Sequence, residues 1–166
     1  MLSFAYILPG ISNEKGGNLN PKRPNRLTTI TINKDQTNIT KTESATFSNG
    51  VYKGSINLGP NYTGPIAIKI KTDGGLTKSI PGIVYLKEGN NNLPTSNIVM
   101  GDLDNNNIIN INDWNAFISC YQLANGLISG NIPATCINAD LNDDGEIDGL
   151  TDLNILYRAF SVREGD

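Results

Sequence analysis

A duplicated acidic motif near the C-terminus restricts the fold of this chain more than any other feature. The first copy runs from Gly101 to Asn115 and the second begins at Ala139. Each copy is followed by a segment in which apolar residues recur at helical spacing. Self-similarity of this kind indicates that one small structural unit occurs twice. We therefore predict two loop–helix units in residues 97–166.

The residue types of each copy suit a loop that binds Ca²⁺. This ion takes six to eight oxygen ligands, which a short loop supplies from positions 1, 3, 5, 7 and 12, with a sharp turn at position 6. Position 6 of the first copy is Asn107, and Asn is well suited to a left-handed turn. The predicted ligands of the first copy are Asp102, Asp104, Asn106, the carbonyl of Ile108, and Asp113. The first loop is therefore complete.

The second copy departs from this spacing at its last ligand. Its predicted ligands at positions 1, 3, 5 and 7 are Asp140, Asn142, Asp144 and the carbonyl of Glu146. Position 12 is Thr151, and the carboxylate of Asp152 comes one residue late. Either a one-residue bulge still delivers Asp152, or Asp148 and water complete the shell. We favour the bulge, and we expect the chain to bind two Ca²⁺ ions.

The strings GDLDNNNIININD and ADLNDDGEID resemble the duplicated segments of dockerin domains, over about residues 98–163. The resemblance implies a non-catalytic module, extracellular or at the cell surface, that binds two calcium ions and docks to a cohesin-like partner. In dockerins the recognition positions lie on the helices after the loops. Here these positions read Trp114-Asn115 and Leu153-Asn154, where Ser/Thr pairs are often found. The resemblance therefore implies docking without specifying the cohesin.

The chain before the repeat has the pattern of an all-β domain. Ile66, Ile68 and Ile70 alternate with other residues and fall on one face of a strand. Asn49-Gly50 and Asp73-Gly74 are typical hairpin turns. Short strands separated by turn residues are typical of a sandwich. We predict an Ig-like or prealbumin-like sandwich over residues 25–96, and thus a multi-domain protein of β class with a small α part.

The N-terminus is an apolar segment ahead of a polar stretch, and we take residues 1–24 as a strand and linker. An extended apolar segment can pair with its own domain or be donated to the sheet of a neighbour. Donation from head to tail builds open filaments. The residues of this assembly strand are Phe4, Tyr6, Ile7 and Leu8. The sequence leaves both roles open.

Two cysteines flank the connector between the loops. Cys120 falls at the end of the predicted first helix, and Cys136 lies just before the second loop. A disulfide between them would stabilise the fold by about 3 kcal/mol, because it restricts the unfolded chain. It would also hold residues 122–135 against the first helix. We predict this disulfide, with two buried thiols as the alternative.

Several classes of function find no support in the residues. The net charge is −3 and no basic patch is longer than Lys22-Arg23, which argues against a nucleic-acid partner. The absence of His removes the usual general base and the usual zinc ligand. No catalytic constellation is evident, so we predict that the chain is not an enzyme. No apolar run is long enough to span a membrane.

These observations predict an extracellular structural or interaction protein whose calcium-stabilised module mediates assembly. Its partner is either a second copy of the chain, in a surface filament or tube built by strand donation, or a cohesin-like protein. A carbohydrate-binding module is a further alternative. In that case Tyr52, Tyr62 and Tyr85 would form a platform for a glycan, although packing in the domain is the favoured role for them.

Overall fold

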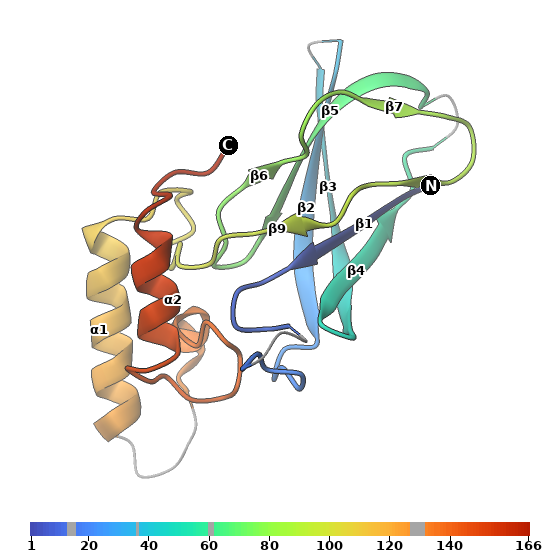
Figure 1. Cartoon of the computed structure of the whole chain (residues 1–166). Coiled ribbons are helices and arrows are strands. Elements are labelled where there is room, and N and C mark those ends of the chain that lie inside the picture. Colours follow the sequence, from blue (N-terminus) through green and yellow to red (C-terminus); the bar gives the residue numbers. More distant parts are fainter. Residues whose placement is uncertain (13–15, 36, 60–61, 127–131) are drawn as a thin grey trace.

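A curved β-sheet makes up most of residues 1–97, and a smaller helical part follows it (Figure 1). The computed structural model describes residues 1–12, 16–35, 37–59, 62–126 and 132–166, and the description below is restricted to them. The strands are β1 (Leu2–Ile7), β2 (Asn25–Lys34), β3 (Thr37–Ser48), β4 (Val51–Ile56), β5 (Gly64–Thr72), β6 (Lys78–Ser79), β7 (Val84–Leu86), β8 (Asn91–Asn92) and β9 (Ser96–Asn97). The helices are α1 (Ile111–Gly126), the 3₁₀ helix η1 (Ala134–Ala139) and α2 (Asp152–Ala159).

Most neighbouring strands of the sheet run antiparallel to each other. The order is β6-β5-β2-β3-β4-β1-β8, with β7 beside β5 and β9 beside β1. Only the contacts of β1 with β8 and β9 are parallel among the described strands. The turn between β3 and β4 is the predicted Asn49-Gly50. Both residues have positive φ, 51° and 82°, as a tight hairpin turn requires.

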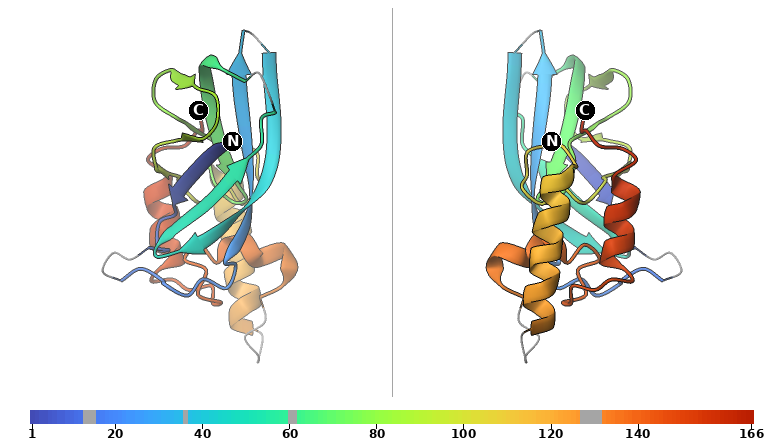
Figure 2. Two further views of the ribbon diagram at one scale, coloured as in Figure 1. Left: turned by 90° about the vertical axis from the view of Figure 1, so that its right-hand side faces the viewer. Right: turned by 90° about the vertical axis from the view of Figure 1, so that its left-hand side faces the viewer.

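The sheet curls so that strands distant in this order face each other. The Tyr6 hydroxyl of β1 lies 2.9 Å from that of Thr28 in β2, although these strands are not neighbours in the sheet. The Tyr6 ring also stacks on Tyr52 of β4, with 5.4 Å between the ring centroids. Figure 2 shows β1 and β4 lying across β2 and β3. The predicted β-sandwich is therefore present, as part of a mostly β protein with a small helical part.

Alternating burial along the strands fills the interior of this sandwich. The burial pattern of β5 alternates as predicted, and Ile66, Ile68 and Ile70 are 0–2% exposed. Ile30 and Ile32 of β2 are fully buried beside them. Period-two alternation places such residues on one face, and burial of that face drives the sheet to close.

The N-terminal segment is a member of the sheet. β1 pairs with β4 on one side and with β8 and β9 on the other. Phe4, Tyr6 and Leu8 are buried, with exposures of 0–2%, whereas Ile7 is half-buried. Of the two roles that the sequence allowed, the structure shows pairing within the chain's own domain. β1 is therefore part of the sandwich in this structure.

The helical part packs α1 beside α2 (Figures 1 and 2). The Trp114 ring of α1 meets Tyr157 of α2 edge-on, with 5.6 Å between centroids. Phe117 and Leu156 are buried. The predicted disulfide is present: Cys120 in α1 and Cys136 in η1 are bonded, with their Cα atoms 5.4 Å apart. Residues 127–131 of the connector between them lie outside the described residues.

The sandwich and the helical part share a continuous boundary. The predicted domain limit at residue 96 falls within β9, and Ile98 and Met100 just beyond it are buried. Leu76 donates its backbone N–H to the carbonyl of Val99, 2.8 Å away. The helical part is thus held against the sheet by backbone hydrogen bonds as well as by apolar contacts.

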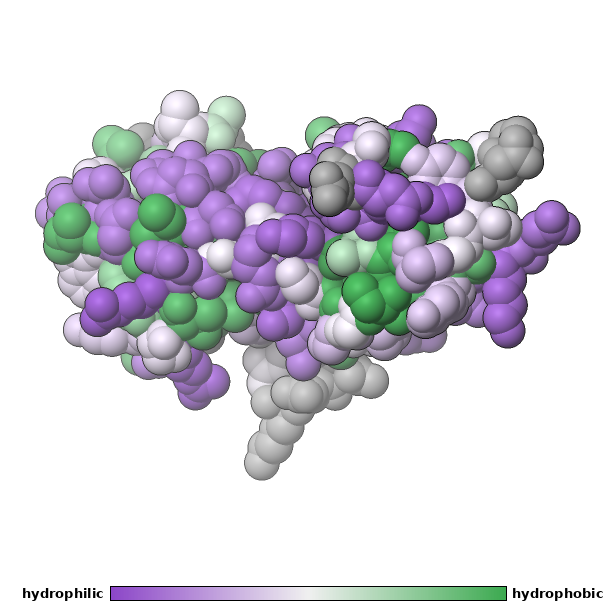
Figure 3. All heavy atoms as spheres, turned by 90° about the horizontal axis from the view of Figure 1, so that it is seen from above, coloured by the Kyte–Doolittle hydropathy of each residue, from purple (hydrophilic) through white to green (hydrophobic). Residues whose placement is uncertain are grey.

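The surface seen in Figure 3 is mostly hydrophilic, with separate hydrophobic patches. Large hydrophobic side chains are nevertheless exposed in the helical part. They are Ile108, Ile111, Leu123, Ile137, Leu150, Tyr157 and Val162. Among the helices that the structure describes, none is long and apolar enough to cross a bilayer.

Candidate metal centre

The first loop is organised around the buried carboxylate of Asp102. Its Oδ2 accepts the backbone N–H of Asn107, at loop position 6, over 2.9 Å. Asn107 has the predicted left-handed conformation, with φ of 70°. Oδ1 of Asp102 is buried and has no hydrogen-bond partner among the described residues. A buried oxygen without a partner is costly, and a cation in the loop would satisfy it.

Asp113, at the start of α1, closes the loop from the opposite side. Its Oδ1 accepts backbone N–H groups from Leu103 (2.8 Å) and Asp104 (3.4 Å). Its Oδ2 accepts the N–H of Asn110 over 2.8 Å. Burial raises the pKa of Asp113 above its usual value, and the three N–H donors oppose that shift. The carboxylate is therefore held rigidly among the residues of its own loop.

The five predicted residues of the first loop come together. Ligand oxygens of Asp102, Asp104 and Asp113 lie within 4.8 Å of one another. The amide of Asn106 donates to Asp104 over 2.8 Å, and its oxygen accepts the N–H of Ile108 over 2.8 Å. Asp104 is exposed and the other two carboxylates are buried, so the cluster opens to solvent on the Asp104 side.

The second loop repeats this arrangement around Asp140. Oδ2 of Asp140 accepts the N–H of Gly145 over 2.9 Å, and Oδ1 accepts that of Asp144 over 3.1 Å. The amide of Asn142 donates to Asp144 over 2.7 Å. Asp144 also accepts the N–H of Glu146 over 2.9 Å. The predicted residues at positions 1, 3, 5 and 7 of the second loop therefore belong to one hydrogen-bonded network.

Asp152 takes the place in the second loop that Asp113 has in the first. Oδ1 of Asp152 accepts the N–H groups of Leu141 (2.8 Å) and Asn142 (3.0 Å), at loop positions 2 and 3. Its Oδ2 accepts the N–H of Asp148, at position 9, over 2.9 Å. Asp113 accepts from the same three positions of its own loop. The extra residue in the second copy is thus absorbed before Asp152.

Thr151 and Asp148 have other roles in the second loop. The Thr151 hydroxyl donates to Asp148 over 2.8 Å and accepts from the amide of Asn142 over 2.9 Å. The Asp148 carboxylate also accepts the N–H groups of Leu150 and Thr151, both at 2.6 Å. Its two oxygens are therefore engaged with the turn that leads into α2.

The carboxylates of the second loop have strongly perturbed acidities. Burial raises the pKa of Asp140 to about 6, and the nearby Asp143 and Asp144 carboxylates add to that shift. Burial likewise raises the pKa of Asp152 to about 7, with a further contribution from Asp140. Buried carboxylates that repel one another bind protons more readily than exposed ones, and a metal cation in their midst reverses this preference.

The donor set of both loops fits Ca²⁺. Each loop offers three carboxylates, one amide oxygen and a backbone carbonyl at position 7, from Ile108 or Glu146. These are the hard oxygen ligands that calcium prefers. The unpartnered Oδ1 of Asp102 and the raised pKa of Asp140 and Asp152 are both features that a divalent cation would relieve.

The sandwich contacts the first loop through the turn after β5. The N–H of Gly74 donates to the side chain of Asn105, at loop position 4, over 3.0 Å. Lys71 of β5 places its Nζ 2.7 Å from Oδ2 of Asp102. A residue of the sheet therefore forms an ion pair with the first carboxylate of the loop.

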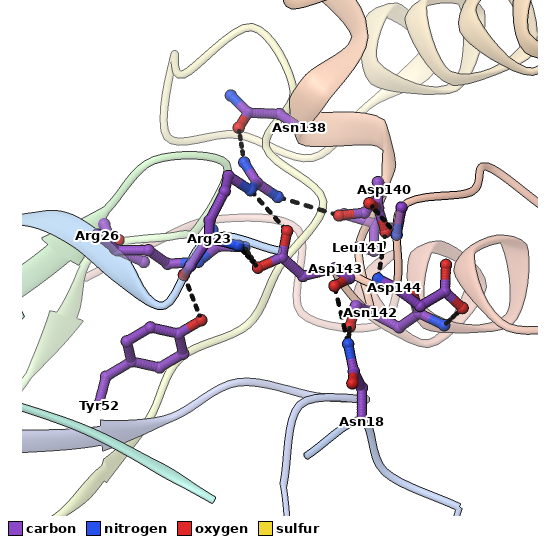
Figure 4. Close-up of polar contacts among 12 residues, drawn as sticks. Asn18, Arg23, Arg26, Tyr52, Asn138, Asp140, Leu141, Asn142, Asp143 and Asp144 are labelled. Carbon is purple, nitrogen blue, oxygen red and sulfur yellow. Dashed lines mark hydrogen bonds and ion pairs between the residues drawn. The ribbon is translucent and has the colours of Figure 1, made fainter. Parts of the chain in front are cut away.

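The sandwich contacts the second loop through the segment that precedes β2. Arg23 donates its backbone N–H and its Nε to the two carboxylate oxygens of Asp143, at loop position 4, over 2.9 and 2.8 Å. Figure 4 shows the same guanidinium directed to Asn138 and to the main-chain carbonyl of Asp140. Asn18 donates its amide to the main chain of the same loop. The predicted linker is therefore bound to the loop along part of its length.

Three residues of this region were not found from the sequence. Lys71 lies in a strand with Lys69 and gives no sign that it reaches a distant loop. Arg23 stands in a polar stretch that is typical of a linker. Asp143 is at position 4, which is not a ligand position. Its left-handed φ of 57°, matched by 58° at Asn105, is the shared feature of the two contacts, and only the structure shows it.

Comparisons with known proteins show a likeness in fold. No protein-family model and no curated protein matches the chain. The solved structures that resemble it include two crystal structures of type II cohesin–X-dockerin complexes from Acetivibrio cellulolyticus. A chain in the C-terminal interface mutant is 19% identical, with a TM-score of 0.58. The likeness covers 95% of the present chain and 93% of that one. A chain in the N-terminal interface mutant is 17% identical, with a TM-score of 0.53 and the same coverage.

Proposed function

We propose that this chain is a non-catalytic, extracellular interaction protein whose C-terminal part binds two Ca²⁺ ions and docks to a cohesin-like protein. This proposal rests on the observation that Asp113 and Asp152 accept the same pattern of hydrogen bonds. Each accepts N–H groups from positions 2, 3 and 9 of its loop. Two loops of different length with the same closing carboxylate support a shared ligand better than they support ordinary turns.

The residues of the chain provide a preformed site for the ion. Calcium would supply positive charge that neutralises the buried carboxylates. The N–H donors at position 6, Asn107 and Gly145, fix the orientation of Asp102 and Asp140. The closing carboxylates fix the start of each following helix. Calcium would therefore stabilise the loops and hold α1 and α2 at their present angle.

The docking role draws on the likeness in fold and on the surface of the helical part. The likeness extends over both the sandwich and the loop–helix units, since it covers 95% of the chain. The two related structures are complexes in which protein partners are bound. Tyr157 and Leu150 are 61% and 80% exposed near α2, and exposed apolar side chains on a stable protein often mark an interface. A cavity of about 610 Å³ beside α2 is lined partly by Leu150, Ile155 and Val162.

The other roles considered from the sequence receive less support. Strand donation would require β1 to leave a sheet in which it is paired on both edges and buried. A glycan platform of three tyrosines is not formed, because Tyr52 is 0% exposed and stacks on Tyr6 inside the sandwich. We therefore propose docking to a cohesin-like protein rather than polymerisation or glycan binding.

The experiment that tests this function uses the purified full chain and a type II cohesin. Size-exclusion chromatography with Ca²⁺ and with a chelator would show whether a complex forms only when calcium is present. Asp113→Asn combined with Asp152→Asn is expected to abolish the complex. The matched control Asp35→Asn, in an exposed turn of the sandwich, is expected to leave it intact. A chain that binds no calcium would overturn the proposal. Calcium binding without cohesin binding would overturn the docking part alone.

A further inference from the structure

A lysine of the sheet is bonded to a carboxylate of the first calcium loop. Lys71 lies near the end of β5, and its Nζ is 2.7 Å from Oδ2 of Asp102. The same Nζ donates to the carbonyl of Gly75 over 3.0 Å, which fixes its direction. The Asp102 side chain is fully buried and that of Lys71 is 26% exposed. The ion pair is therefore a defined contact in partly buried surroundings, where charges interact strongly.

The lysine and a metal ion would use different oxygens of this carboxylate. Oδ2 of Asp102 is taken by Lys71 and by the N–H of Asn107. Oδ1 is buried and has no partner among the described residues. The ammonium group therefore does not fill the place of the ion. It lies on the same carboxylate, where it adds a positive charge next to the loop.

The second loop has no such arrangement in the part of the chain that is described. The carboxylate oxygens of Asp140 accept hydrogen bonds from backbone N–H groups. Arg23, which precedes β2, donates to the main-chain carbonyl of Asp140 and pairs with Asp143. Asp143 is at position 4 and is not a predicted ligand. Both loops thus meet a cation from the sandwich, but only in the first loop does it pair with a ligand carboxylate.

We propose that Lys71 is a built-in counter-ion of the first loop, which lowers the calcium affinity of that loop and keeps it ordered when calcium is absent. The proposal rests on the proposed calcium-binding function and makes its two sites unequal. The second loop fills first as calcium rises, and the first loop fills later. Lys71 is a positioning residue, since it acts on the ion through Asp102.

The sign of the effect follows from the charges. The first loop offers three carboxylates, and Lys71 reduces their net charge by one. A positive charge on a ligand carboxylate also repels the incoming divalent ion. Electrostatic repulsion at such a short distance corresponds to a loss of affinity of about tenfold or more. A lysine that served only to tie the loop to the sheet would have the opposite effect, because its removal would loosen the site and weaken calcium binding.

The test follows the backbone amides of Asn107 and Gly145 by nuclear magnetic resonance during a calcium titration of the full chain. Each amide donates to the first carboxylate of its own loop, so each reports one site. The variant is Lys71→Met, which removes the charge and keeps the apolar stem. Lys71→Arg retains the charge. Lys69→Met is the matched control, since Lys69 is an exposed residue two positions earlier on the same strand.

The expected result is a selective change at the first site. In Lys71→Met, the calcium midpoint reported by Asn107 falls by about tenfold, while that of Gly145 stays constant. Lys71→Arg and Lys69→Met keep the midpoints of the original chain. In chelator, the Asn107 amide of Lys71→Met exchanges with solvent faster than in the original chain.

The outcomes that overturn the proposal are separate from the failure of the calcium function. An Asn107 midpoint that is unchanged or raised in Lys71→Met overturns the counter-ion role and leaves calcium binding in place. Equal behaviour of Lys71→Arg and Lys71→Met also overturns it, because charge would not be the cause. If neither amide of the original chain responds to calcium, both proposals fail together.

Discussion

The two acidic loops of this chain have the same hydrogen-bond pattern around their closing carboxylate, although their sequences differ in length. The first has the standard spacing, with its closing carboxylate at position 12. The second carries one extra residue, yet Asp152 accepts N–H groups from the same three loop positions as Asp113. The two loops therefore share the hydrogen-bonded placement of this carboxylate, although its position in the sequence differs by one residue.

The loops also differ in how the sandwich holds them. In the first loop a lysine pairs with the carboxylate of Asp102, at position 1, and in the second an arginine pairs with Asp143, at position 4. In both loops the residue at position 4 has a left-handed backbone and bonds to the sandwich. The two acidic loops are therefore also the contact surface between the two parts of the molecule.

Removal of the closing carboxylate of the second loop should have the largest effect. Asp152→Ala leaves three backbone N–H groups of the loop without their acceptor, which is expected to cost about 4 kcal/mol of unfolding free energy. Calcium binding at this loop should also be lost. Thr151→Ala, at the standard position 12, is the matched control and should change stability by less than about 1 kcal/mol. Urea unfolding measures both. Equal effects of the two variants would show that Asp152 does not replace a position-12 residue.

Loss of the disulfide should weaken the second loop more than the first. The double variant Cys120→Ser, Cys136→Ser is expected to lose about 3 kcal/mol, because the unfolded chain regains the freedom that the bond removed. Cys136 lies in η1, directly before the second loop, so Gly145 should respond to calcium at a higher concentration. Asn107 should respond as before. A larger change at Asn107 than at Gly145 would contradict this distinction.

Loss of the Arg23 contact should weaken the attachment of the second loop to the sandwich. Arg23→Met removes the side-chain hydrogen bonds to Asp143, Asn138 and the carbonyl of Asp140, and it keeps the backbone hydrogen bond to Asp143. Asp143 then has only Arg26, 3.5 Å away, as an ion-pair partner. We expect a loss of about 2 kcal/mol. Lys22→Met is the control, since its side chain is exposed and its neighbour Asp143 is contacted only by the Lys22 backbone. A loss of equal size in both variants would show that the Arg23 contact has no special role.

The pH dependence of stability should change sign with calcium. The pKa of Asp140 is about 6 and that of Asp152 about 7 in the folded chain, above the unfolded value of about 3.9. Their contribution to stability is therefore fully present below about pH 4 and is lost as the pH rises through 6 and 7. Without calcium, the urea midpoint should fall between pH 5 and pH 8. With saturating calcium it should rise, because protons compete with the ion for these carboxylates.

Two features separate this behaviour from other titrations of the chain. The pKa of Asp166 is lowered, chiefly by its hydrogen bond from the backbone of Ser79, and this residue titrates below the tested range. Asp152→Asn should reduce the slope without calcium, because the group with the highest of these pKa values no longer titrates. A calcium-free urea midpoint that rises between pH 5 and pH 8 would contradict the account.

The two acidic loops could be predicted from the sequence because the residues that form them are close together along the chain. Asp102, Asp104 and Asn106 are close together along the chain, and the left-handed turn at Asn107 follows from the residue type. The disulfide could also be predicted from the positions of Cys120 and Cys136 at the two ends of the connector. Local spacing and residue type are enough for features of this kind.

The long-range contacts could not be predicted from the sequence. The pairing of Lys71 with Asp102 and of Arg23 with Asp143 depends on how the curled sheet meets the helical part, which no residue pattern specifies. The sequence leaves the role of β1 open for the same reason. An apolar strand has the same residue pattern whether it pairs with its own sheet or with that of a neighbour. The role depends on whether strands of the same chain lie beside β1 to pair with it, and only the complete fold shows this.

The number of calcium ions bound by the full chain can be counted by isothermal titration calorimetry after chelator has been removed. We expect two bound ions per chain, and one ion after Asp152→Ala. No binding would contradict the calcium function altogether. A single ion in the original chain would contradict the claim that the second loop, with Asp152 one residue beyond position 12, forms a calcium site of its own.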